Sequence, residues 1–218
     1  MHTREHYDAE LTNLHQQLHE LGTMTTTVVA QALDALTRQD FALARQIRAN
    51  DAVIDQAQHR IEEHAVSLIA RQQPVARDLR RIIAAIAISS ELERIADYAK
   101  GIARLVIGPP NSRPLVASAA LLRVGTLAQA SLTHVLLAVA ANDAVAAQAL
   151  ALEEEQIDRL YKQLKAQLAA DLATNPDPAR AADLLFVAQN FERIADRATN
   201  IAERVVYWAN AQMIALNP

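Results

Sequence analysis

The sequence predicts an all-α protein, a tandem of duplicated three-helix bundles with six long antiparallel helices. Half of the 218 residues are hydrophobic and only four are glycine, a composition that is typical of helices and excludes a disordered chain. Apolar residues recur at helical spacing, and no segment shows the strict alternation of a strand. The pentapeptide Glu-Arg-Ile-Ala-Asp occurs at Glu93–Asp97 and again at Glu192–Asp196, 99 positions later, which indicates an internal duplication.

Helix-breaking residues divide the chain into six segments. Residues 108–114 form the only Gly- and Pro-rich stretch, so we expect a first bundle over 1–108, this linker, and a second bundle over 115–218. Prolines interrupt each half, and Asp40 and Asn142 or Asp143 can cap the helices that follow weaker stops. The expected helices lie near residues 5–38, 40–71, 75–107, 115–141, 143–173 and 179–213.

Each expected helix has an apolar face or a boundary that supports it. The first carries Leu11, Leu14, Leu18 and Leu21 at helical spacing. The second follows the Asp40 stop, and the third runs from the proline at 74 to the linker. The fourth begins after the linker, the fifth after the 142–143 stop and the sixth after residues 174–178. In the last helix the apolar positions are Phe191, Ile194, Ile201 and Val205.

Composition limits the class of protein. The absence of cysteine excludes disulfides, thiolate metal sites and a cysteine nucleophile. A net charge of −4 gives no basic surface for nucleic acid. The N-terminus lacks the apolar region of a signal peptide, and we expect no stretch of roughly 18–20 apolar residues to span a bilayer. The sequence therefore predicts a soluble, cytoplasmic protein.

Paired carboxylates are the most informative side chains. Among 25 acidic residues only four pairs are spaced i,i+4, and one pair falls on the second and one on the third helix of each half. Residues four apart share a helical face, so four carboxylates per half can converge into an oxygen site for Mg²⁺, Mn²⁺, Ca²⁺ or iron. The alternative is a solvated acidic face on which Arg94 and Arg193 serve as ion-pair partners. The four pairs are Asp51/Asp55, Glu93/Asp97, Glu154/Asp158 and Glu192/Asp196.

Other candidate groups are few. His15 and His19 are four apart on the first helix but have no equivalent in the second half, and His59 shares a face with Asp55 as an auxiliary ligand or a surface histidine. No Glu-x-x-His, G-x-S-x-G, phosphate-binding glycine loop or Arg/Lys cluster for phosphate is present. We interpret Trp208 and its neighbours as packing residues and the protein as a non-enzyme.

The chain resembles the PhoU family of phosphate-signalling regulators over essentially its whole length. The first copy of the motif is Gln-Gln-Pro-Val-Ala-Arg-Asp-Leu-Arg at 72–80, leading into Ser-Ser-Glu-Leu-Glu-Arg-Ile-Ala-Asp-Tyr-Ala at 89–99. The second is Asn-Phe-Glu-Arg-Ile-Ala-Asp-Arg-Ala-Thr-Asn-Ile-Ala-Glu at 190–203. The resemblance implies a cytoplasmic homodimer or higher oligomer that damps the phosphate-starvation response. It implies contacts with the ATPase subunit of a phosphate ABC transporter and with a sensor histidine kinase.

The resemblance also implies that Mg²⁺ or Mn²⁺, Zn²⁺ or iron binds at the duplicated motif. By position the ligands are Asp51, Asp55, Glu93 and Asp97 in the first bundle and Glu154, Asp158, Glu192 and Asp196 in the second. Asn200 and Glu203 extend the second set, whereas the first copy has Gly101 and Arg104 there, which favours the second site. A helical scaffold that works without metal, and a carboxylate-bridged metal store or oxidase, are the alternatives.

Overall fold

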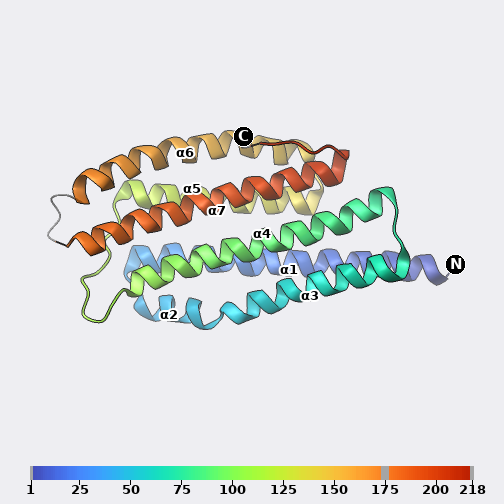
Figure 1. Cartoon of the computed structure of the whole chain (residues 1–218), viewed down its shortest axis with the longest axis horizontal. Coiled ribbons are helices and arrows are strands. Elements are labelled where there is room, and N and C mark those ends of the chain that lie inside the picture. Colours follow the sequence, from blue (N-terminus) through green and yellow to red (C-terminus); the bar gives the residue numbers. More distant parts are fainter. Residues whose placement is uncertain (1, 173–176, 217–218) are drawn as a thin grey trace.

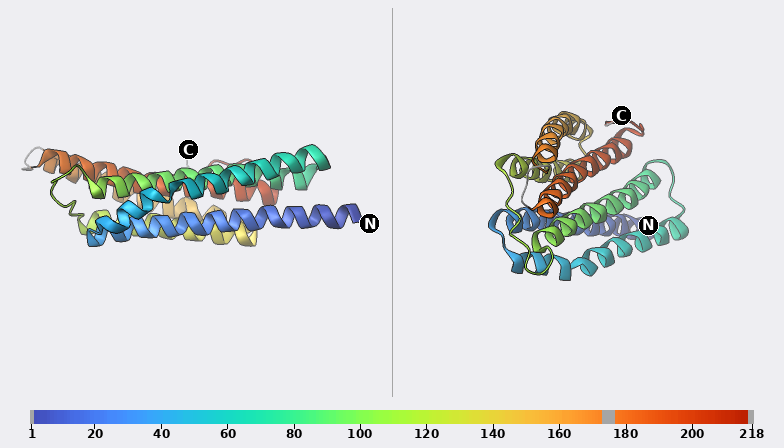
Figure 2. Two further views of the ribbon diagram at one scale, coloured as in Figure 1. Left: turned by 90° about the horizontal axis from the view of Figure 1, so that it is seen from below. Right: turned by 60° about the vertical axis from the view of Figure 1, so that its left-hand side comes forward.

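The computed structural model describes residues 2–172 and 177–216, all of whose regular structure is helical (Figure 1). This confirms the all-α prediction. The helices run along the long axis of the molecule (Figure 2). Helices α1 to α4 form the first bundle and α5 to α7 the second. The helices are α1 (His2–Arg38), α2 (Phe41–Ala49), α3 (Asp51–Gln72), α4 (Ala76–Ile107), α5 (Ala119–Ala141), α6 (Ala144–Leu172) and α7 (Pro178–Asn210).

The second expected span is two helices, not one, because the chain breaks at Asn50. Asn50 ends α2, donating its N–H to the carbonyl of Gln46, and directly precedes α3 with φ −91° and ψ 2°. Asn and Asp compete with helical hydrogen bonds through their short polar side chains, so an Asn-Asp pair favours a break. The same dipeptide at 142–143 had indicated a helix boundary, so the signal was present in the sequence.

Capping side chains set the other helix starts. Asp40 Oδ1 accepts hydrogen bonds from the N–H groups of Ala42 and Leu43, each at 2.9 Å, and Asp143 caps α6 in the same way. Asn142 instead ends α5 in the left-handed conformation. Helix α5 begins after its cap Ser118, so residues 115–118 continue the linker rather than opening the helix as expected.

The two bundles share one apolar core. The third helix of each half, α4 and α7, pack against one another, and α1 also contacts α5 (Figure 1). Phe191, Leu92 and Ile95 are fully buried in a single cluster that draws on both halves. The halves are therefore duplicated in sequence but joined by continuous packing.

Arg180 fastens the linker to the start of α7. This side chain is only 7% exposed. It donates to the carbonyls of Leu105 and Arg113 at 2.9 and 2.8 Å and pairs with Asp183 at 2.8 Å. Gly108 lies against it with φ +61°, and a Cβ at that position would stand 2.6 Å from the Arg180 guanidinium. The linker thus has a fixed conformation that the sequence did not indicate.

We expected no segment long and apolar enough to span a bilayer, and by length and composition this expectation was wrong. Helix α5, with 23 residues, is long and apolar enough. Thr126, Gln129 and Ser131 interrupt its apolar run, so that no strictly apolar stretch of that length is present in the sequence. In the fold α5 packs against α1, α6 and α7, and a core helix passes the same test, so this property is weak evidence for a membrane span.

Candidate metal centre

The predicted carboxylates lie on the paired helices expected for them. Glu93 and Asp97 belong to α4, which packs against α3 with Asp55. In the second half α6 and α7, which carry the other two pairs, also pack together. Asp51 opens α3, and its side chain lies outside the described part of the structure. Each half therefore brings its acid-bearing helices side by side.

The four carboxylates of the second half act on one another electrostatically. Burial is the largest cause that raises the pKa of Glu154. The neighbouring charges of Asp158, Asp196 and Glu192 raise it further. Burial also raises the pKa of Glu192, with Asp196 as the next cause. When these carboxylates are ionised their negative charges repel one another, and a bound cation would offset that repulsion.

Three of these four carboxylates line a surface depression of about 540 Å³. Glu154, Asp158 and Glu192 contribute to its wall, together with Lys162 and Leu216. Leu216 belongs to the C-terminal segment, which folds back from the end of α7 (Figure 1). Its N–H donates to Glu203 Oε1 at 2.8 Å, so Glu203 holds the chain terminus. Asn200 is half-buried on the same helix.

The first half has a weaker acidic set. Burial raises the pKa of Glu93, and the charges of Asp97 and Asp55 add to the effect. Asp97 pairs with Lys100 at 2.7 Å. A cavity of about 450 Å³ beside Asp97 is lined otherwise by Arg48, Lys100, Gly101 and Arg104. The fold thus adds cations here, including Arg48 from α2, which sequence spacing could not place next to α4.

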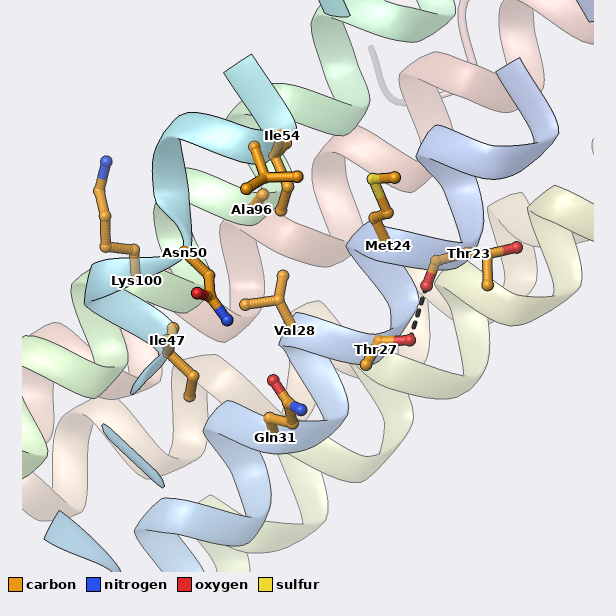
Figure 3. Close-up of a pocket in the computed structure, with 11 residues that line it drawn as sticks. Thr23, Met24, Thr27, Val28, Gln31, Ile47, Asn50, Ile54, Ala96 and Lys100 are labelled. Atoms are coloured by element: carbon orange, nitrogen blue, oxygen red, sulfur yellow. Dashed lines mark hydrogen bonds between the residues drawn. The ribbon is translucent and has the colours of Figure 1, made fainter. Parts of the chain in front are cut away.

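A second cavity shares Lys100 and lies at the α2–α3 break. It measures about 400 Å³ and is mostly apolar, with Met24 and Val28 from α1 facing Ile47 and Ile54 (Figure 3). In Figure 3 the Asn50 side chain points into the space between α1 and the break. The break at Asn50 therefore borders a cavity that the single helix expected over residues 40–71 did not predict.

No coordination sphere is assembled among the described side chains. Within residues 5–50, 52–172 and 177–216, no three His, Asp or Glu side chains are placed so that they could hold one ion. In each acidic set a lysine forms an ion pair with one predicted ligand. Lys162 Nζ lies 2.6 Å from Asp158 Oδ2, and Lys100 pairs with Asp97 in the same way. A metal would require these side chains to turn and the lysines to leave, and the ligand set stays a prediction.

The arginines expected as partners of the acids act on them through their charges, because Arg94 and Arg193 oppose the rise in the pKa of Glu93 and of Glu192. The Arg193 guanidinium lies over the Tyr98 ring, 5.8 Å from its centroid, across the α4–α7 contact. Arg197, one turn further along α7, reaches Glu91 at 3.4 Å and the motif acid Asp196 at 3.7 Å. Further counter-charges come from Lys100 and Lys162, which lie three and four residues after the motif acids Asp97 and Asp158 and face the same side of the helix.

No hydrogen bond or ion pair joins the candidate histidines to the paired carboxylates among the described residues. His59 is exposed on α3, and no hydrogen bond or ion pair joins it to another described residue. His15 and His19 line a cavity with Trp208 instead. The second acidic set therefore consists of oxygen ligands alone, which suits hard cations.

Comparison with known proteins identifies the family. A family model described as "PhoU domain" matches residues 18–106 and again 121–205. The chain belongs to the PhoU family. It is 35% identical over 210 residues to the phosphate-specific transport system accessory protein PhoU homolog of Rhizobium meliloti (strain 1021), covering 95% of this chain and 89% of that one. The homolog from Caulobacter vibrioides (strain NA1000 / CB15N) is 37% identical over 204 residues, at 93% and 89% coverage.

Solved PhoU structures agree in fold. The phosphate transport system regulatory protein PhoU from Streptococcus pneumoniae superposes with a TM-score of 0.88 at 31% identity, covering 95% of this chain and 99% of that chain. PhoU from Pseudomonas aeruginosa gives 0.87 at 32% identity, with 94% and 100% coverage. The resemblance noted in the motif is thereby confirmed over nearly the whole chain.

Proposed function

We propose that this protein is an accessory regulator of a phosphate transport system and has no catalytic activity of its own. The observation that carries the proposal is the PhoU-domain match in both halves of the chain. The relatives that match nearly end to end are named phosphate-specific transport system accessory proteins. The sequence offers no nucleophile or cofactor motif, which favours action by contact.

In this proposal the protein works in the cytoplasm as a homodimer or higher oligomer. It damps the phosphate-starvation response when phosphate is plentiful. It does so by contacting the ATPase subunit of the phosphate ABC transporter and a sensor histidine kinase, and it meets the membrane only through these partners. The long helical faces of a rigid bundle suit an adaptor, because they present fixed surfaces to several proteins.

We further propose that the second acidic set binds a divalent or trivalent metal ion, of the class Mg²⁺, Mn²⁺, Zn²⁺ or iron. Support comes from the raised pKa of Glu154 and of Glu192 and from the depression that these residues share. The first set, with Asp55, Glu93 and Asp97, is the weaker site because Lys100, Arg48 and Arg104 surround it. Bound metal would fix the acidic surface that a partner recognises.

A scaffold that works without metal is the second candidate. The contacts of Lys100 with Asp97 and of Lys162 with Asp158 favour it, because each gives a motif acid a counter-charge within the chain. The two proposals differ in one respect: partner binding by the metal-free scaffold is sensitive to salt but indifferent to chelator.

The regulatory proposal is tested by affinity co-purification from phosphate-replete cells, with partners identified by mass spectrometry. We expect the transporter ATPase or the sensor kinase among them. Recovery of neither, in cells shown to express both, would contradict the adaptor function. Repeating the experiment with chelator, and then with raised salt, separates the metal-dependent from the metal-free form.

A further inference from the structure

A cavity of about 340 Å³ lies where the two halves of the chain meet, away from the acidic sets. Its wall combines His15 and His19 of α1, Arg81 near the start of α4, Asn142 at the end of α5 and Trp208 near the end of α7. Its volume falls in the range of small-molecule sites. The cavity therefore involves both bundles in one binding space.

The aromatic wall of the cavity is held by close contacts. The His15 imidazole is stacked on the Trp208 indole, with ring centroids 4.9 Å apart and 11° between the planes. The Arg81 guanidinium carbon lies 5.5 Å from the same indole centroid. Trp208 is only 5% exposed. The indole thus contacts both a titratable ring and a permanent cation.

Four buried polar atoms on these residues lack partners among the described residues. They are Trp208 Nε1, His15 Nε2, Arg81 Nε and Asn142 Oδ1. Buried polar atoms in folded proteins are almost always hydrogen-bonded, and leaving one unpaired is costly. All four atoms belong to residues of one cavity wall, so a ligand that turns these side chains toward the cavity would supply the missing bonds.

The charges at this cavity favour an anion. Arg81 carries a permanent positive charge, and no Asp or Glu contributes to the wall. Asp78, one turn before Arg81 on α4, forms no ion pair with it in the described part of the chain, and the charges of both act on Tyr7. Burial, followed by the charge of Arg81, lowers the pKa of His15, so a cation there is disfavoured unless an anion joins it. The guanidinium and the indole N–H are both donors.

Leu18, Leu136, Val139 and Ala140 form an apolar part of the wall, and Thr12 and Gln16 complete it. We propose that this cavity binds a small organic anion, with its phosphate or carboxylate at Arg81 and an apolar or aromatic body against the leucines. This site shares no residue with the two acidic sets. Because its residues come from α1, α4, α5 and α7, the ligand would tie the ends of both bundles together.

The protein has a single tryptophan, so the emission of Trp208 reports on this cavity alone. We would titrate the full chain with phenyl phosphate and AMP as anionic probes, and with adenosine and inorganic phosphate as controls. We expect at least one organic anion to change Trp208 emission saturably, with adenosine and inorganic phosphate binding at least tenfold more weakly. No response to either organic anion, or equal binding of inorganic phosphate, would overturn the proposal.

Matched variants locate the anion. Arg81→Gln should weaken the responding probe by about tenfold or more, because a charged hydrogen bond is lost. Arg81→Lys should recover part of the affinity, and the exposed Arg77→Gln on the same helix should change nothing. Melting curves would show that the variants remain folded. Unchanged affinity in Arg81→Gln, or a Zn²⁺ response lost in His19→Ala, would assign the cavity to another ligand and contradict the proposal.

Discussion

His15 lies parallel to Trp208 at a centroid distance of 4.9 Å, and this contact joins the first helix of the chain to the last. Residues so distant in sequence meet because α1 contacts α4 and α4 packs on α7. Arg81 on α4 completes the group. Both the ligand cavity and the stability of the bundle junction therefore depend on the state of one imidazole.

The stability of the protein should fall when His15 is protonated. Burial and the charge of Arg81 lower the pKa of His15 in the folded chain below its ordinary value near 6.5. The unfolded chain then binds more protons, so the stabilisation is present above pH 6.5 and is lost as the pH falls through the folded pKa. We expect urea unfolding, followed by Trp208 emission between pH 7.5 and 5.5, to show this loss.

The matched variant His15→Asn should remove the His15 share of that dependence. Every other ionisable group is the same in the two proteins and should contribute equally to both. The informative quantity is therefore the difference between wild type and variant. A parallel decline in both would mean that His15 is not the group responsible.

Arg180→Met should destabilise the protein by about 3 kcal/mol or more. The buried guanidinium satisfies the carbonyls of Leu105 and Arg113, and its removal leaves them and Asp183 without their donor. Urea unfolding would measure the loss. The neighbouring exposed Arg104→Met is the control and should change stability by less than about 0.5 kcal/mol. Equal effects of the two substitutions would contradict a fastening role for Arg180.

The sequence predicted most helix ends because they are decided locally. Asp40 and Asp143 cap by bonds to N–H groups two and three residues on, and proline excludes helix from its own neighbourhood. The break at Asn50 was missed although the Asn-Asp signal was there. Apolar residues continue at helical spacing across the break, through Ile47 and Ile54, as they would in one continuous helix.

The features that sequence did not predict depend on contacts between distant segments. Lys100 and Lys162 follow the motif acids at helical spacing, so the sequence itself indicates these ion pairs. Arg48 lies beside Asp97 only because the fold packs α2 against α4. Arg180 and Trp208 looked like ordinary helical residues. Arg180 contacts the linker and Trp208 lies where the bundles meet. The spacing of apolar residues in the sequence does not predict contacts of this kind.

Metal content should depend most on the second acidic set. Glu192→Ala combined with Asp196→Ala removes two of four interacting carboxylates, and we expect metal retained by the purified protein to fall strongly. Glu93→Ala with Asp97→Ala should cost less, because Lys100 and Arg104 already oppose a cation there. Elemental analysis of protein purified without chelator or nickel affinity gives the stoichiometry. Unchanged content in both double variants would remove the metal proposal.

Glu192→Gln should change stability in opposite directions with and without metal. Without metal the substitution removes like-charge repulsion and the burial of a charge, so it should stabilise the protein by about 0.2–0.5 kcal/mol, or about 1–2 °C in Tm. At about 100 times its Kd a bound metal adds about 2.7 kcal/mol to the wild type, and the variant should lose much of that gain. Melting curves in chelator and in Mn²⁺ make the comparison.

The control for this reversal is Glu155→Gln, which lines the same depression but is exposed and paired with Arg159 at 3.6 Å. It removes the same charge without removing a predicted ligand, so its effect should keep one sign in both conditions. If Glu192→Gln stabilised the protein equally in chelator and in Mn²⁺, the acidic set would be a solvated face. The lysine contacts of Asp97 and Asp158 would then be its lasting counter-charges, and the metal-free scaffold would be the better account of this chain.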